Sequence, residues 1–165
     1  IDYLRKKGIA KAAKRAGRNT SQGMVGSYIH MGGKIGVLLE VNCESDFVAR
    51  TEDFQHLVKE VAMHIAAADP KYVRREDVPA ELVEKEKAIY RSQFEGSGKP
   101  AQVIEKIVEG KLGSFYSQIA LLDQPSVRDQ AVTVGQMVSQ AVAKTGENIV
   151  VSRFSRFKLG ESAAE

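Results

Sequence analysis

Two glycines between two strand-like runs constrain this chain more than any other feature of its sequence. The runs, residues 25–30 and 35–41, contain the β-branched and aromatic side chains that favour strands. Gly32 and Gly33 occupy the centre of the turn between them, and a tight hairpin needs positive φ at such positions. The sequence therefore predicts an antiparallel β-hairpin whose second, strongly apolar strand is buried.

The apolar period changes after this hairpin and a short acidic corner. Between residues 54 and 65 the apolar side chains recur at spacings of three and four, which is typical of one stripe of an amphipathic helix. Thr51 is the expected N-cap of this helix, and Asp69 followed by Pro70 is its expected end. A hairpin that leads directly into a helix favours an α+β arrangement over a parallel βαβ unit.

The rest of the chain predicts more helices and one more strand. Residues 79–124 contain two helical stretches joined by a Gly/Pro turn, which indicates an αα-hairpin. A shorter helix is expected from Thr133 to about Lys144, ended by Gly146, and residues 148–159 predict a final strand that could join the hairpin. The predicted fold class is α+β: a small antiparallel sheet, made of the hairpin and the C-terminal strand and packed with helices, plus an αα-hairpin.

The basic residues of the chain are concentrated at its start. Residues 1–18, which the pattern predicts to be helical, hold seven Lys and Arg and one Asp, although the net charge of the whole chain is only +3. An RNA- or ribosome-binding module led by this segment is the competing interpretation, since positive charge alone binds phosphates. Tyr3 is the single aromatic residue there that could stack on a base, so the segment lacks the means for RNA recognition.

Few residues of this chain are suited to catalysis or metal binding. Cys43 is the single cysteine, and neither it nor His30, His56 or His64 has the spacing of a zinc site or of a nucleophile with its base. The glycines fit no phosphate-binding motif, and no apolar run approaches the ~20 residues that span a bilayer. We therefore expect no catalytic residue, no cofactor, no metal and no membrane association.

The corner at residues 42–50 allows two interpretations. In one, Ser45 or Asp46 caps a helix and Phe47 covers the core as an apolar plug. In the other, Asp46 and Phe47 form a projecting tip that inserts into a partner. His64 also allows two interpretations. It lies at the edge of the apolar stripe, where it is either a boundary residue that packs at the helix flank or a contact at a protein interface.

Residues 40–50, EVNCESDFVAR, closely resemble a signature of the elongation factor Ts family, E-[aliphatic]-N-C-x-T-D-F-V-A-[KR]. Ser45 stands where the family has threonine, so the hydroxyl is kept and a methyl is lost. Further similarity follows in family order along nearly the whole chain, at residues 4–8, 12–16, 26–30, 35–38, 62–65, 83–86, 98–100, 108–111 and 146–149.

The resemblance implies a function. The family exchanges guanine nucleotide on elongation factor Tu, without covalent chemistry. Carried over by position, Ser45, Asp46, Phe47 and Val48 would disturb the Mg²⁺ site of that partner, with Phe47 as a wedge and Asp46 as an anionic contact. Ile35, Gly36 and His64 match further partner contacts.

The resemblance also implies an organisation. Residues 1–20 would be a linker helix from an upstream ubiquitin-associated-like domain, which we expect to precede Ile1, and residues 21–165 a core and dimerisation domain with its helical hairpin at about 79–124. Long family members have two α+β subdomains, whereas this chain has one, so a homodimer that binds two copies of elongation factor Tu is implied. We expect a bacterial cytoplasmic location, with an organellar stroma or matrix as the alternative, and no nucleic-acid partner.

Overall fold

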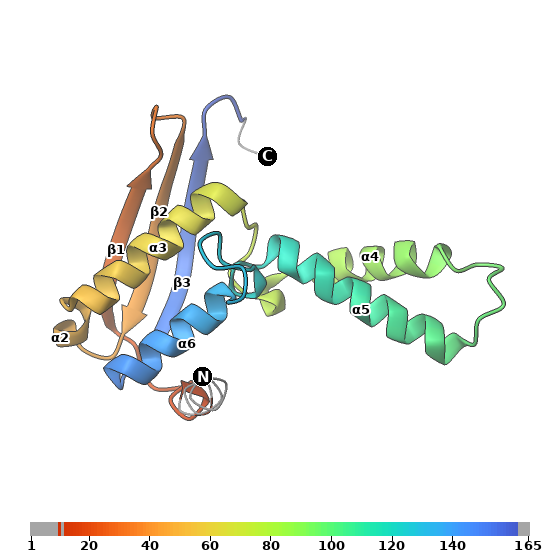
Figure 1. Cartoon of the computed structure of the whole chain (residues 1–165), viewed down its shortest axis with the longest axis horizontal. Coiled ribbons are helices and arrows are strands. Elements are labelled where there is room, and N and C mark those ends of the chain that lie inside the picture. The colour runs from red at the N-terminus through yellow and green to blue at the C-terminus, as the bar shows by residue number, and fades with distance from the viewer. Residues whose placement is uncertain (1–9, 11, 162–165) are drawn as a thin grey trace. The chain divides into compact units, whose positions relative to one another are not determined.

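Figure 1 shows the computed structural model of the chain, which describes residue 10 and residues 12–161. The chain divides into two compact units, one formed by residues 1–69 with 125–165 and the other by residues 70–124. The first contains an antiparallel sheet and the second a pair of long helices, which confirms the predicted α+β class. Most of the helix expected over residues 1–18 lies outside the described residues. Of the described ones, residues 10, 12 and 13 are helical, but residues 14–17 form turns, so the prediction of helix up to residue 18 is wrong.

The sheet is built around β2 (Ile35–Cys43), which pairs with β1 (Gln22–Ile29) on one side and β3 (Ile149–Lys158) on the other. Gly32 and Gly33 have φ angles of 85° and 68°, so the predicted hairpin turn is confirmed. The predicted C-terminal strand is confirmed as β3, which lies antiparallel to β2 along its whole length. The central strand is therefore held by backbone hydrogen bonds on both edges.

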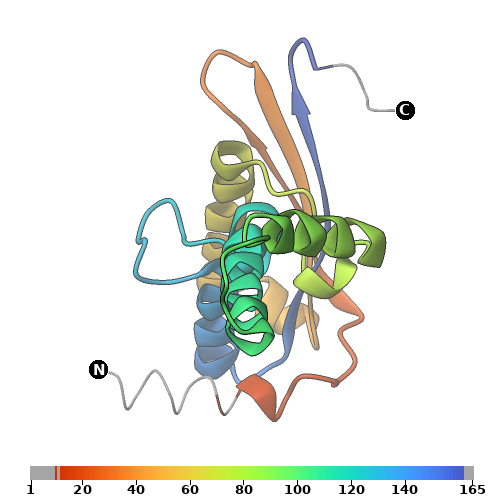
Figure 2. The same ribbon diagram turned by 90° about the vertical axis from the view of Figure 1, so that its right-hand side faces the viewer.

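Two helices cover one face of this sheet, α3 (Glu52–Ala68) and α6 (Val134–Thr145), as Figures 1 and 2 show. The predicted Thr51 cap is confirmed, because its hydroxyl accepts the N–H of Phe54, and α3 ends at Asp69 in the left-handed conformation. Side chains from β2, β3 and α3 form the core between the two layers, and its fully buried members include Val37, Leu39, Val41, Val151, Phe54, Val61 and Ile65.

The opposite face of the sheet is open within the described part of the first unit. Large apolar side chains on it are 52–75% exposed: Val25, Ile29, Leu38, Phe157 and Leu159. Farther along the strands the same face becomes polar, where Arg153 Nε donates to Glu40 Oε2 at 2.7 Å and holds the pKa of that carboxyl below its usual range. The open face thus has an apolar half near the hairpin turn and a charged half near the other end of the strands.

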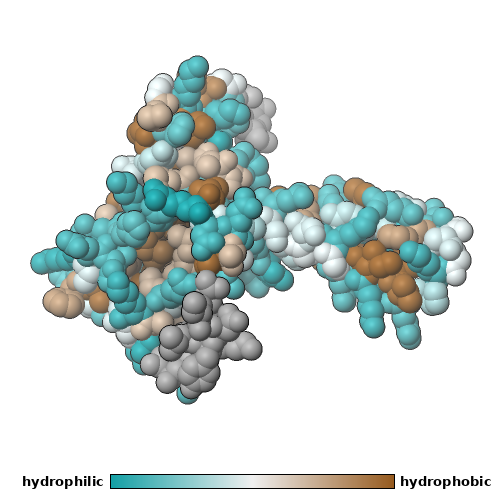
Figure 3. All heavy atoms as spheres, viewed as in Figure 1, coloured by the Kyte–Doolittle hydropathy of each residue, from teal (hydrophilic) through white to brown (hydrophobic). Residues whose placement is uncertain are grey.

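The second unit contains the predicted αα-hairpin. Its long helices are α4 (Ala80–Ser92) and α5 (Ala101–Ile119), flanked by the short 3₁₀ turns η1 (Arg75–Asp77) and η2 (Leu121–Asp123). Arg91 on α4 donates two hydrogen bonds to the carboxylate of Glu105 on α5, at 2.7 and 3.0 Å. Figure 3 shows apolar side chains gathered on one side of this hairpin. Ile89 on α4 and Val103 on α5 are exposed large apolar residues of the hairpin.

The sequence pattern predicts that the second helix of the hairpin continues up to Pro125, but α5 ends at Ile119. Ala120 is extended and forms a β-bridge with Tyr72, and Leu121 N–H donates to Tyr72 C=O at 2.8 Å. These backbone bonds replace the helical ones, so the apolar periodicity beyond Ile119 belongs to a 3₁₀ turn. The difference arises because this pairing joins residues far apart in the chain.

The packing of β1 against α3 gives a test of the fold. A Cβ added to Gly26 would lie 2.3 Å from Cγ1 of Val58, which is itself buried in the core. We expect Gly26→Ala to lower the free energy of unfolding by about 1–3 kcal/mol, because an overpacked core must shift. Urea unfolding measures this, with Ser27→Ala on the exposed side as a control expected within about 0.5 kcal/mol of the unsubstituted chain. An unchanged stability for Gly26→Ala would contradict the packing described.

Candidate functional site

The corner after β2 folds into a single helical turn, α2 (Asp46–Ala49). Ser45 is its N-cap: the backbone of Ser45 is extended, and its Oγ accepts the N–H of Val48 at 3.3 Å. Thr51 closes the turn by donating its hydroxyl to the carbonyl of Val48 at 2.7 Å before it caps α3. We call residues 45–48 the tip.

The tip exposes one side chain and buries the next. Phe47 is 77% exposed, whereas Val48 is 5% exposed and anchors the turn in the core. The interpretation of Phe47 as a plug over the core is therefore wrong, and Val48 is the residue of this turn that enters the core. Consecutive residues of a helical turn point about 100° apart, which is why one can be buried while the next projects.

The acidic residue of the tip is also exposed. Asp46 accepts a hydrogen bond from Arg50 at 2.8 Å, and both side chains are mostly exposed to solvent. An exposed ion pair of this kind contributes at most about 1 kcal/mol. The carboxylate of Asp46 therefore remains free to exchange Arg50 for a different cation or donor.

Behind the tip, an acidic residue that the sequence pattern did not single out holds the corner in place. Glu147, between α6 and β3, accepts the hydroxyl of Ser45 at 2.6 Å and the N–H of Ser45 at 3.0 Å, one on each carboxylate oxygen. A second hydrogen bond joins the same two segments in the reverse sense, because Glu44 Oε1 accepts the N–H of Asn148 at 2.7 Å. We call these four residues, Glu44, Ser45, Glu147 and Asn148, the clasp.

Cys43 lies directly before the clasp and is fully buried. Its thiol donates to the carbonyl of Ser45 at 3.1 Å, and burial raises the pKa of the Cys43 thiol. A buried thiol with a raised pKa is a poor nucleophile. The structure therefore gives Cys43 a packing role behind the tip.

Ile35 and Gly36 lie at the opposite end of β2 from the tip. Eight residue steps separate Ile35 from Cys43, which is roughly 26 Å of strand. Ile35 faces the helices, whereas Gly36 faces the open side, where an added Cβ would lie 2.9 Å from Cδ1 of Ile29. The structure thus separates the predicted contact residues into two regions at the two ends of the sheet.

His64 belongs to the second of these regions, but it is buried. The structure places it in the core of the first unit at 1% exposure, so the expected boundary position is wrong. Its Nδ1 accepts the N–H of Val127 at 3.2 Å and so fixes the loop that leads to α6. Helix periodicity alone could not show this, because the loop that covers His64 comes from residues more than sixty positions away.

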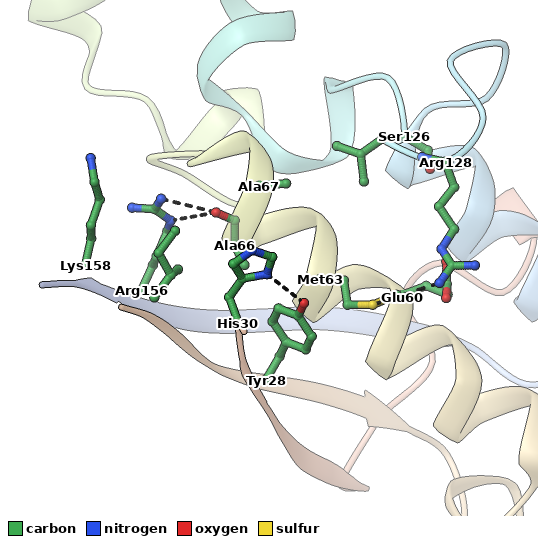
Figure 4. Close-up of a pocket in the computed structure, with 12 residues that line it drawn as sticks. Tyr28, His30, Glu60, Met63, Ala66, Ala67, Ser126, Arg128, Arg156 and Lys158 are labelled. Carbon is green, nitrogen blue, oxygen red and sulfur yellow. Dashed lines mark hydrogen bonds and ion pairs between the residues drawn. The ribbon is translucent and has the colours of Figure 1, made fainter. Parts of the chain in front are cut away.

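A pocket of about 450 Å³ lies beside that loop, shown in Figure 4. Its lining combines apolar residues such as Ile35, Met63 and Val127 with several polar ones. In Figure 4 the hydroxyl of Tyr28 and Nδ1 of His30 are joined by a hydrogen bond of 3.0 Å at one wall.

Each arginine of this pocket is held in place by a partner. Arg156 is largely buried and donates to the carbonyl of Ala66 at 3.1 and 3.3 Å, as Figure 4 shows. Arg128 pairs with Glu60 at 2.9 Å. The pocket is therefore a partly apolar depression whose two arginines are held by hydrogen bonds and ion pairs.

The described residues contain no group of three or more His, Cys, Asp or Glu side chains that could bind a metal ion. In the same part of the chain, no helix is both long and apolar enough to cross a membrane. The two regions of interest are therefore the tip with its clasp and the pocket beside Ile35.

Comparison with known proteins places this chain in a family. The family model described as "Elongation factor TS" matches residues 9–161. Elongation factor Ts of Koribacter versatilis is 63% identical over 161 residues, which are 98% of this chain and 74% of that protein. Elongation factor Ts of Fervidobacterium nodosum is also 63% identical, over 98% of this chain and 82% of that protein, and the Geobacter sulfurreducens protein is 59% identical over 98% and 74%. The chain therefore belongs to the elongation factor Ts family of translation elongation factors.

Proposed function

We propose that this chain is a guanine-nucleotide exchange factor that binds elongation factor Tu and promotes release of GDP. The observation that carries the proposal is the tip: an exposed Phe47 on a helical turn whose next residue, Val48, is buried. A large apolar side chain displayed on a fixed turn is suited to insertion between the side chains of a partner. Membership of the elongation factor Ts family supports elongation factor Tu as the proposed partner.

The proposed mechanism is differential binding. The chain binds nucleotide-free Tu more tightly than GDP-bound Tu, and by linkage the same coupling free energy weakens the binding of GDP. GTPases hold their nucleotide through a phosphate-binding loop and a Mg²⁺ ion that bridges phosphate oxygens. Displacement of the elements that hold this ion removes several charge-assisted contacts at once. No covalent step is required, so we propose no enzymatic chemistry for the chain.

Within the tip, burial divides the four residues between two roles. Asp46 and Phe47 are exposed and make the proposed contacts with the Mg²⁺ region of Tu, one anionic and one apolar. Ser45 and Val48 face inward, so they hold the turn rather than contact the partner. The segment then functions as a unit in which two residues bind and two position.

The pocket beside Ile35 is the proposed second contact region. Ile35 lines it directly, whereas Gly36 lies at the same end of β2 but faces the open side of the sheet, next to Ile29. His64 is too deeply buried to reach a partner in this structure, so its proposed effect passes through Val127, which it holds at the pocket wall.

We further propose that two copies of the chain pair through the open face of the sheet. The apolar half of that face exposes Val25, Ile29, Leu38 and Phe157, and a second sheet packed ~10 Å away would cover them. The charged half, with Glu40 and Arg153, would lie toward the edge of such an interface.

A translation factor of this family acts where translation takes place, so the proposed location is the cytoplasm of a bacterium.

The exchange proposal is tested by removing the exposed ring. We expect Phe47→Ala to slow the release of fluorescent GDP from elongation factor Tu by at least tenfold, because the contact made during displacement is lost, and to shift the melting temperature by less than about 2 °C. Stopped-flow fluorescence measures the release rate.

Ile89→Ala is the matched control, since it also removes an exposed apolar side chain but on α4, and it should retain the full rate. If the unsubstituted chain itself gives no acceleration, the proposed function is wrong.

The role of His64 is tested by comparing stability with exchange. His64→Ala leaves the N–H of Val127 without its acceptor, so we expect the free energy of unfolding to fall by about 1–3 kcal/mol together with a slower exchange. His64→Asn keeps an acceptor near the same position and should therefore recover part of the lost stability and part of the lost exchange rate. Urea unfolding and the fluorescence assay give the two values. Slower exchange at undiminished stability would instead indicate a direct contact between His64 and the partner.

The dimer is tested by placing charges on the open face. We expect the chain to have the mass of a dimer in light scattering at micromolar concentration, and Leu38→Glu with Phe157→Glu to have the mass of a monomer, because two buried carboxylates oppose association. Val103→Glu on α5 is the control and should remain dimeric. A monomeric mass for the unsubstituted chain would refute the proposed pairing.

A further inference from the structure

The tip has too few contacts of its own to stay folded. Helix α2 has four residues, and so short a helix is unstable in isolation because nucleation costs more than its few hydrogen bonds return. Its side chains on the outer surface, Asp46 and Phe47, add nothing to the core. Contacts from outside the segment must therefore supply the order that a wedge requires.

Glu147 supplies contacts of that kind from 102 positions away in the sequence. One carboxylate oxygen accepts the backbone N–H of Ser45 at 3.0 Å, and the other accepts its hydroxyl at 2.6 Å. Because the hydroxyl hydrogen points to Glu147, the lone pairs of Ser45 Oγ are left to accept the N–H of Val48. A charged acceptor makes these bonds stronger than neutral ones.

The carboxylate is itself held in a fixed position. Glu147 follows Gly146, which ends α6 in the left-handed conformation with φ of 82°, and it precedes the first residues of β3. Glu44 accepts the N–H of Asn148, so each of the two segments of the clasp supplies a carboxylate that accepts a backbone N–H of the other. The orientation of α2 is therefore set by the junction of α6 and β3 as well as by β2.

We propose that Glu147 is a positioning residue for nucleotide exchange: it fixes the hydroxyl and backbone of Ser45, and through them the direction in which Phe47 projects. This inference rests on the proposed function, and it assigns a role in it to a residue outside the tip. A wedge held in one orientation loses less conformational entropy on binding, so the clasp raises the exchange rate by preorganisation.

The experiment combines exchange kinetics with hydrogen exchange on the full chain. Glu147→Ala should slow the release of fluorescent GDP from elongation factor Tu by at least fivefold. In the background of Phe47→Ala it should cause less than a twofold further change, since it acts through that ring. If the two effects multiply instead, or if Glu147→Ala retains the full rate, the positioning role is overturned.

Lys144→Ala is the matched control, because it breaks another ion pair at the same end of α6, with Asp53 at 2.6 Å, and leaves the clasp intact. It should retain both the exchange rate and the protection of the tip. Ser45→Val, which lacks the hydroxyl that Glu147 accepts, should slow exchange as Glu147→Ala does.

Hydrogen exchange of the chain alone separates this inference from the proposed function. In Glu147→Ala, but not in Lys144→Ala, the amide of Val48 should exchange at least tenfold faster than in the unsubstituted chain. If the unsubstituted chain fails to release GDP from Tu, the proposed function is wrong. Hydrogen exchange of Val48 still shows in that case whether Glu147 orders the tip. Unchanged protection of Val48 would show that Glu147 does not order the tip.

Discussion

The central strand β2 is the element on which the rest of the first unit depends. It is paired on both edges, and its alternate side chains point into the core beneath α3 and α6. A shift of one residue in this pairing would turn every buried side chain to the open face, so the register is strongly specified. Both regions of functional interest lie at the ends of this strand, with Ile35 at its start and Ser45 just after its end. Their separation is therefore as fixed as the register itself.

Local signals in the sequence were enough to predict the three strands and the longer helices of this fold, apart from the end of α5. Gly32 and Gly33 specify the hairpin turn, and Thr51 and Thr133 begin helices where their hydroxyls can cap them. Each of these effects acts over four residues or fewer, so a reading of the sequence can find it. The surroundings of the tip could not be found in this way, because Glu147 and Ser45 are 102 positions apart and the pairing of β3 with β2 brings them together. The same reason explains His64, whose burial depends on a loop that follows the second unit.

The direction of Phe47 is the point at which sequence reasoning left two outcomes open and the structure distinguishes them. A cap at Ser45 fits both a plug and a projecting ring, because the cap fixes where the turn begins and not which side chain enters the core. The choice is made by which side chain of the turn is buried, and in this structure it is Val48. Protein cores are close-packed, so a turn that buries Val48 directs the neighbouring Phe47 outward. The exposed ring is thus a consequence of how the core is filled.

A protein that acts by differential binding has to solve a problem that an enzyme with a reactive group does not. Its working side chain must be exposed before the partner arrives, and exposure removes the core contacts that would otherwise order it. This chain meets the two demands with neighbouring residues and a remote carboxylate. Val48 fixes the depth of the turn, and Glu147 fixes its orientation through Ser45 without covering Phe47. The scarcity of reactive groups in the sequence and the several hydrogen bonds behind the tip then have a common explanation. In the proposed function, the free energy that weakens GDP binding comes from contacts between the tip and its partner. The hydrogen bonds behind the tip hold it in the shape that makes those contacts.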